Sequence, residues 1–168
     1  RNALEENRLE LHVQPIVRLP NRRPTFYECF ARVRDEHGKT IFPAAFLSVA
    51  KEEGMSGALD NLILFQCVQL IRQLGARKAG VKFFCNISSS SLQDEAFFGQ
   101  FVEFMSANTE LADRLIFEFD YQEAKNLGRS ILSELARLAK RGYRFSVDNV
   151  DTTDVNTAEL ADRHIGFV

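Results

Sequence analysis

The chain has 168 residues, of which 45% are hydrophobic, and it contains 15 Phe and no Trp at a formal net charge of -2. This composition is typical of one globular domain with its own core and excludes a disordered chain. Because the net charge is close to zero, the protein has no broad basic face, and we expect no binding to duplex nucleic acid. No apolar run approaches the roughly 20 residues that a bilayer-spanning helix needs.

The cysteines and the chain ends indicate where the protein works. Cys29, Cys67 and Cys85 are odd in number and far apart, without a CxxC pair. This spacing favours three buried, reduced thiols over a disulfide framework or a zinc site. We therefore expect a cytoplasmic protein, or the cytoplasmic part of a longer, membrane-anchored one. The chain starts without a signal peptide and stops at a strand-like sequence, residues 166–168, so we also expect a fragment of a longer polypeptide.

The first predicted elements are a helix end and a hairpin. Residues 4–8 resemble the end of a short helix. Residues 9–17 alternate apolar and polar side chains, as a strand does, and residues 25–33 form a second strand rich in aromatics. The short, proline-bounded turn at 19–24 predicts that the two strands are antiparallel neighbours.

Helices and strands alternate in the rest of the chain. Pro43 opens a predicted helix that reaches residue 53, and a long amphipathic helix follows up to residue 74. Further strands are predicted at 81–87, 115–119, 143–148 and from 166, and further helices at 94–107, 122–140 and 157–162. The buried side of the helix at 94–107 is expected to carry Phe97, Phe101, Phe104 and Met105. This order implies parallel strands joined by right-handed crossovers, and both an open doubly wound sheet and a closed barrel fit it.

Four strands carry a polar side chain near one shared edge, namely Glu28, Asn86, Glu118 and Asp148. An acid in a strand that is covered on both faces is costly unless it is paired or bound to a cation. In such folds, ligand sites gather where the strands finish. Any one of the four would be explained by a helix cap or an ion pair, but four equivalent positions favour a shared site. Carboxylate and amide oxygens suit Mg²⁺, Mn²⁺ or Ca²⁺ rather than zinc.

Arg32 lies four residues after Glu28, so the two side chains face the same side of a strand. A guanidinium beside an acidic cluster suits a phosphate ligand. A salt bridge from Arg32 to Glu118 or Asp148 fits the pattern equally well. No Ser-His-Asp order, phosphate loop or GxGxxG motif is present.

Several segments resemble the EAL domain family. Residues 13–17 (VQPIV) are similar to the QPI strand that opens these domains, and residues 27–32 (YECFAR) resemble the segment that names them. In the latter, Cys29 and Phe30 replace Ala and Leu. Further similar segments follow in unbroken order at 41–47, 59–60, 85–88, 117–119 and 147–149. The resemblance covers the whole chain.

The resemblance implies an α/β fold, a TIM-like (β/α) barrel of EAL type with an antiparallel first strand. Residues 1–168 would then be a single EAL-like domain, incomplete in this fragment because it stops before the last strands. Active members open cyclic di-GMP with two Mg²⁺ or Mn²⁺ ions. By position, the metal ligands would be Glu28, Asn86, Glu118 and Asp148. The nucleotide would contact Gln14, Glu28, Phe30 and Arg32.

The sequence departs from the family pattern at several positions. Phe30 stands where the signature leucine touches the ligand, and Asn149 replaces the second aspartate. Residues 150–153 (VDTT) replace a glycine-rich loop, and residues 120–121 (DY) replace Thr-Glu. The catalytic lysine of the family would fall after Val168.

These departures predict a degenerate, catalytically inactive EAL domain. It would act in bacteria as a cyclic di-GMP receptor or as a signalling and protein-interaction module, with protein partners or a homodimer. Motility and surface attachment are the outputs that the resemblance implies. Two alternatives stay open: an active, metal-dependent cyclic di-GMP phosphodiesterase, and a scaffold that binds no nucleotide.

Overall fold

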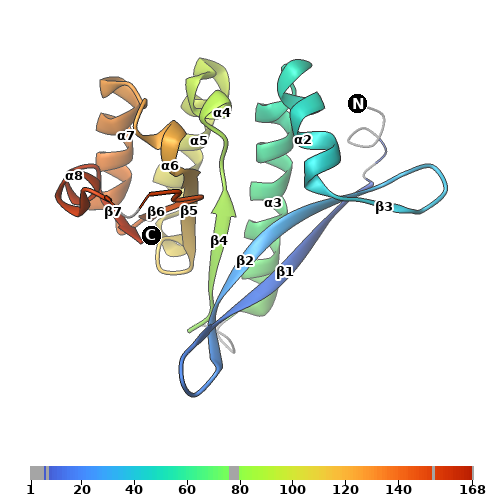
Figure 1. Ribbon diagram of the computed structural model, residues 1–168, viewed down its shortest axis with the longest axis horizontal. Coiled ribbons are helices and arrows are strands. Elements are labelled where there is room, and N and C mark those ends of the chain that lie inside the picture. The colour runs from blue at the N-terminus through green and yellow to red at the C-terminus, as the bar shows by residue number, and fades with distance from the viewer. Residues whose placement is uncertain (1–5, 7, 76–79, 153, 168) are drawn as a thin grey trace. The chain divides into compact units, whose positions relative to one another are not determined.

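The computed structural model describes residues 6, 8–75, 80–152 and 154–167. The chain divides into two compact units, Arg1–Cys85 and Asn86–Val168. Both units combine strands and helices (Figure 1). None of the described helices is long and apolar enough to span a membrane. The helix end predicted at 4–8 falls mostly outside the described residues.

The first unit is built around a hairpin. Its elements are β1 (Leu9–Arg18), β2 (Arg23–Arg34), β3 (Thr40–Ile41), α2 (Pro43–Glu52), α3 (Ser56–Leu74) and β4 (Lys82–Asn86), whose last residue belongs to the second unit. Strands β1 and β2 are antiparallel, which confirms the predicted hairpin, and β2 and β4 are parallel. Strand β3 pairs with the end of β2 and was not predicted, because two residues are too short to show a period.

One face of β2 packs into the core of the first unit. Cys29, Ala31 and Val33 alternate along the strand and are all buried. The three cysteines of the chain are free and buried, as predicted. Contact with Cys67 and burial raise the pKa of the Cys29 thiol far above its ordinary value, so this thiol stays protonated. The residues that alternate with these three along β2 therefore face the other side of the sheet.

The second unit has three parallel strands. Its elements are α4 (Ser89–Gln93), α5 (Glu95–Ala107), the 3₁₀ turn η2 (Thr109–Leu111), β5 (Leu115–Asp120), α6 (Tyr121–Ala124), α7 (Arg129–Lys140), β6 (Arg144–Asp148), α8 (Thr157–Asp162) and β7 (Ile165–Phe167). Strands β5, β6 and β7 pair in parallel, which confirms the prediction made from alternating elements. Ser88 begins α4, because its side chain accepts a hydrogen bond from the Ser91 backbone.

The helix predicted at 122–140 is wrong in one respect, because two helices occupy this range. Helix α6 begins at Tyr121, where the Asp120 side chain accepts a hydrogen bond from the Glu123 backbone. Helix α7 starts only after Gly128, whose extended backbone (φ -68°, ψ 158°) stands before its first turn. Aspartate followed by glutamate three residues later is a strong helix start, and glycine is a poor helix former.

Aromatic packing shows which face of strands β5 and β6 is covered by a helix. Phe117 on β5 and Phe145 on β6 are register partners and fully buried. The Phe101 ring of α5 meets the Phe117 ring edge-on at 4.9 Å between centroids. Phe104, predicted to be buried with Phe101, is 38% exposed, so the buried stripe of α5 is narrower than expected. Residues that alternate with Phe117 and Phe145 face away from α5.

Candidate functional site

The first unit brings the four predicted nucleotide-contacting residues to one surface. Glu28, Phe30 and Arg32 alternate with the buried residues of β2 and so share the opposite face. Gln14 on β1 lies directly across from Glu28 in the antiparallel ladder. Directly opposed residues of neighbouring strands project to the same face. Their roles toward a nucleotide stay a prediction, but their common surface is part of the fold.

The Arg32 guanidinium contacts two aromatic rings, those of Phe30 and Phe42. Its Cζ atom lies over the Phe30 ring at 5.5 Å from the centroid and over the Phe42 ring at 5.0 Å. One guanidinium nitrogen donates a hydrogen bond of 2.8 Å to the Ala31 carbonyl oxygen. Sequence reasoning missed Phe42, because it stands ten positions after Arg32 with no periodic relation to it.

In the second unit, Glu118 is a buried acid with a defined donor. Its side chain is 8% exposed. The Ser146 hydroxyl donates a hydrogen bond of 2.9 Å to Glu118 Oε1, and the two residues are partners in the β5–β6 ladder. A hydrogen bond to a buried carboxylate offsets part of its desolvation cost. Ser146 was not among the predicted site residues, although its position two residues before Asp148 places both on one face.

Asp148 lies beside a second carboxylate. Its register partner on β5 is Asp120, and burial together with the Asp120 charge raises the pKa of Asp148 above its ordinary value. Asp120 accepts hydrogen bonds from the Glu123 backbone at 3.0 Å and from the Asn149 amide at 3.3 Å. The sequence marked Asp120 only as a family departure. Its spacing of two from Glu118 was the available signal for a shared face.

The two asparagines of the predicted site differ in their settings. Asn86 ends β4, and the following Ile87 backbone donates a hydrogen bond of 3.0 Å to the Glu118 carbonyl oxygen. The chain just after β4 therefore lies beside β5. Asn149 follows Asp148 in a left-handed conformation with φ 52°, which asparagine tolerates better than most residues.

The donor chemistry of these residues fits a hard divalent cation. Glu118, Asp148 and Asn86 offer only oxygen ligands, which suit Mg²⁺ or Mn²⁺. The raised pKa of Asp148 reflects burial and an acid next to an acid, an arrangement that a bound cation relieves. Over residues 8–75, 80–152 and 154–167, no three His, Cys, Asp or Glu side chains are grouped closely enough to hold a metal ion. The residues therefore match a divalent cation in the type of ligand atom they offer, but among the described residues they do not form a coordination shell.

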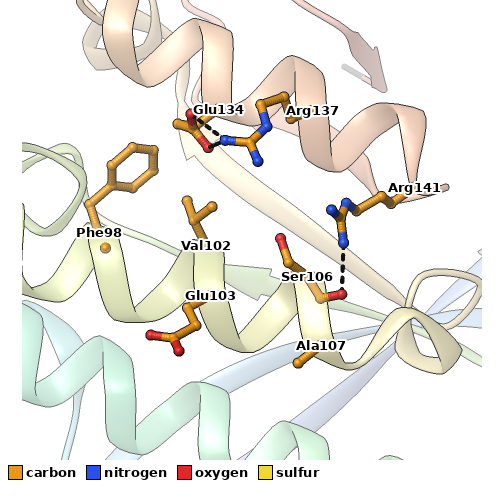
Figure 2. A pocket seen from close by; sticks show the side chains of 9 residues that line it. Phe98, Val102, Glu103, Ser106, Ala107, Glu134, Arg137 and Arg141 are labelled. Atoms are coloured by element: carbon orange, nitrogen blue, oxygen red, sulfur yellow. Dashed lines mark hydrogen bonds and ion pairs between the residues drawn. The ribbon is translucent and has the colours of Figure 1, made fainter.

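A surface hollow of about 490 Å³ lies elsewhere in the second unit, between α5 and α7 (Figure 2). Glu134 and Arg137 form an ion pair on its α7 side, and Arg141 donates a hydrogen bond of 2.8 Å to the Ser106 carbonyl oxygen. None of the residues predicted for metal or nucleotide lines this hollow. It is therefore distinct from the strand-end residues described above.

Comparison with known proteins decides the family. A model of the EAL domain matches residues 1–168. The chain belongs to the EAL domain family. A curated relative, "Cyclic di-GMP phosphodiesterase PdeF" of Escherichia coli (strain K12), is 27% identical over 158 residues, which cover 94% of this chain. The EAL chain spans only 21% of the length of PdeF.

Solved EAL proteins have the same fold. The EAL enzyme Bd1971, in its cAMP- and cyclic-di-GMP-bound form, matches with a TM-score of 0.81 at 19% identity, over 99% of this chain and 46% of that one. The S helix-GGDEF-EAL part of LapD from Vibrio cholerae, bound to c-di-GMP, also gives 0.81, at 15% identity, over 96% of this chain and 39% of that one. At such identities the likeness establishes the fold alone. It confirms the α/β, TIM-like architecture of EAL type with an antiparallel first strand.

Proposed function

We propose that this EAL domain is a cyclic di-GMP receptor of bacterial signalling that binds the nucleotide without hydrolysing it. The names of its relatives support the ligand, since PdeF is a cyclic di-GMP phosphodiesterase and the LapD structure contains c-di-GMP. The common surface of Gln14, Glu28 and Arg32 supports a nucleotide site in the first unit. In the cytoplasm, the domain would relay binding to protein partners or to a second copy of the chain.

The proposal that the domain does not hydrolyse the nucleotide rests on Asn149. Asn149 stands next to Asp148 and its amide donates to Asp120. An amide at this position provides no negative charge for a second cation, and it is engaged with a carboxylate that also caps α6. A pair of metal ions needs several anionic ligands to offset its charge. The neutral side chain therefore favours binding over turnover.

Each proposed ligand has a chemical reason. Arg32 has in-plane N–H donors that match phosphate oxygens, and Gln14 provides an amide on the same surface. In the second unit, a single Mg²⁺ or Mn²⁺ would be held by Asn86, Glu118 and Asp148. When bound, such a cation polarises a phosphate and lowers the pKa of its water. Phe30 would pack against the nucleotide where the family has leucine.

The second candidate is an active phosphodiesterase. It is favoured by the buried Glu118, which keeps its Ser146 donor, and by the adjacent Asp148. Asparagine at 149 can still ligate a cation through its carbonyl oxygen, although more weakly than a carboxylate. This candidate differs from the receptor in one outcome, the release of linear dinucleotide.

Calorimetric titration of the full-length protein with cyclic di-GMP tests the proposal, first in EDTA and then with Mg²⁺ or Mn²⁺. We expect saturable binding that Arg32→Ala weakens at least tenfold, since a charged hydrogen-bond donor to phosphate is lost. Arg18→Ala, which removes an exposed arginine from the far end of β1, is the matched control and should bind like the wild type. Absence of any heat of binding would leave the scaffold alternative. Chromatography of the same samples detects linear product and separates the receptor from the phosphodiesterase.

A further inference from the structure

Phe42 is an exposed aromatic residue with an unusual neighbour. Its side chain is 60% exposed, yet its ring centroid lies 5.0 Å from the Arg32 Cζ atom. Neither its family position nor the sequence pattern assigned it a role. An exposed phenylalanine gains little from burial, so its contact with a cation calls for an explanation.

We propose that Phe42 is a positioning residue for the nucleotide site, which holds the Arg32 guanidinium ready for a phosphodiester group. The proposal rests on the proposed function, because it concerns the same ligand. It extends that function to a residue outside the strand set Gln14, Glu28, Phe30 and Arg32. Phe42 acts through Arg32 and need not touch the phosphate.

The backbone places Phe42 beside Arg32 by register. Strand β3 pairs antiparallel with β2, with Ile41 opposite Val33. Phe42, the residue that follows β3, therefore comes level with Arg32, the residue before Val33 on β2. Pro43 then opens α2, and the Phe42 carbonyl oxygen accepts a hydrogen bond of 2.9 Å from the Ala45 backbone. A two-residue strand and a helix start thus fix the position of the ring.

The geometry suits preorganisation of an arginine. Five N–H donors lie in the guanidinium plane, and arginine commonly stacks on aromatic rings through the face of that plane. Phe30 and Phe42 contact the guanidinium without accepting a hydrogen bond from it, and one nitrogen is fixed by its hydrogen bond to the Ala31 carbonyl oxygen, so N–H donors remain for an anion. An unrestrained arginine loses rotamer freedom when it binds, and a restrained one loses less.

The test compares cyclic di-GMP affinities of the full-length protein by calorimetry. Phe42→Ala should raise the Kd about two- to fivefold, the size of an exposed cation–π contact. Phe42→Tyr keeps an aromatic face and should restore the affinity to within about twofold. Phe65→Ala is the matched control, because Phe65 on α3 belongs to the same unit and is 55% exposed. Its Kd should equal that of the wild type.

A double-mutant cycle separates positioning from a general structural effect. In an Arg32→Gln background, Phe42→Ala should change the Kd by less than about 1.5-fold, since the planar cation it holds is gone. An equal loss in both backgrounds would overturn the proposal, as would an unchanged Kd for Phe42→Ala in a protein that binds cyclic di-GMP. In those two cases the receptor function stands. Failure of the wild type to bind at all would instead overturn both.

Discussion

Replacing Asn149 with aspartate would put a carboxylate where an amide now donates to Asp120 at 3.3 Å. The side chain keeps its size, and asparagine and aspartate both tolerate the left-handed backbone, here φ 52°. The change therefore alters charge and hydrogen bonding with little effect on sterics. The ends of β5 and β6 would then carry three neighbouring acids, at positions 120, 148 and 149.

The cost follows from Coulomb repulsion and a lost hydrogen bond. Two charges about 4 Å apart repel by roughly 1 kcal/mol in water and about 4 kcal/mol at an effective dielectric constant of 20. Asn149 is exposed, so the lower figure applies. Loss of the hydrogen bond to Asp120 adds about 1 kcal/mol, which gives a total of about 2 kcal/mol when metal is chelated. A cation at 100 times the Kd of the variant returns about 2.7 kcal/mol, and the variant gains more than the wild type because a carboxylate binds the cation more tightly than an amide does.

Thermal unfolding in EDTA and in Mn²⁺ measures the stability of Asn149→Asp relative to the wild type without and with a cation. Asn149→Asp should unfold about 4–8 °C below the wild type in EDTA and at or above it in saturating Mn²⁺. Asn149→Gly is the control, because glycine accepts φ 52° and adds no charge, so Mn²⁺ should shift it no more than the wild type. An Asn149→Asp protein that gains nothing from Mn²⁺, by unfolding and by calorimetry, would show that residue 149 does not border a cation site.

Three further predictions concern the second unit. Burial and the Asp120 charge raise the pKa of Asp148 above the ordinary value of 3.8, so the folded protein favours the protonated side chain. The protonated carboxyl therefore stabilises the fold fully below about pH 3.8, and this stabilisation is lost as the pH rises through the folded-state pKa. In EDTA, Asp148→Asn should therefore flatten the fall in unfolding temperature above about pH 4, and an unchanged slope would refute this cause. Ser146→Ala removes the donor to Glu118 and should cost about 1.5–3 kcal/mol in urea unfolding, whereas Ser146→Thr, which keeps the hydroxyl, should cost less. Tyr143→Phe should cost about 1–2 kcal/mol in the same assay, since the hydroxyl shares its one proton between the backbone carbonyl oxygens of Met105 and Asn108; a neutral effect would contradict that assignment.

The shared strand face of Glu28 and Arg32 was predictable from sequence. Period-two alternation put Glu28 and Arg32 on one side of β2, and the short turn set the antiparallel pairing that brings Gln14 opposite Glu28. Polar side chains within apolar strands are costly, which is why Glu118 and Asp148 stand out in the sequence. These inferences used local rules only.

What the sequence did not reveal depends on register and on competing local signals. The Phe42–Arg32 contact arises from a two-residue strand that has no period of its own. The break between α6 and α7 is set by the Asp120 cap and by Gly128, whereas the apolar spacing alone runs through both helices. The Ser146–Glu118 hydrogen bond needs the β5–β6 register, which no single strand encodes.

The most direct measurement counts linear dinucleotide released per molecule of full-length protein incubated with excess cyclic di-GMP and saturating Mn²⁺. If Asn149 leaves the second cation without an anionic ligand, the protein should bind the nucleotide and release less than one equivalent of product over hours. The Asn149→Asp variant provides the internal comparison. Sustained, multiple turnovers by the wild-type protein would contradict the receptor function and establish the phosphodiesterase.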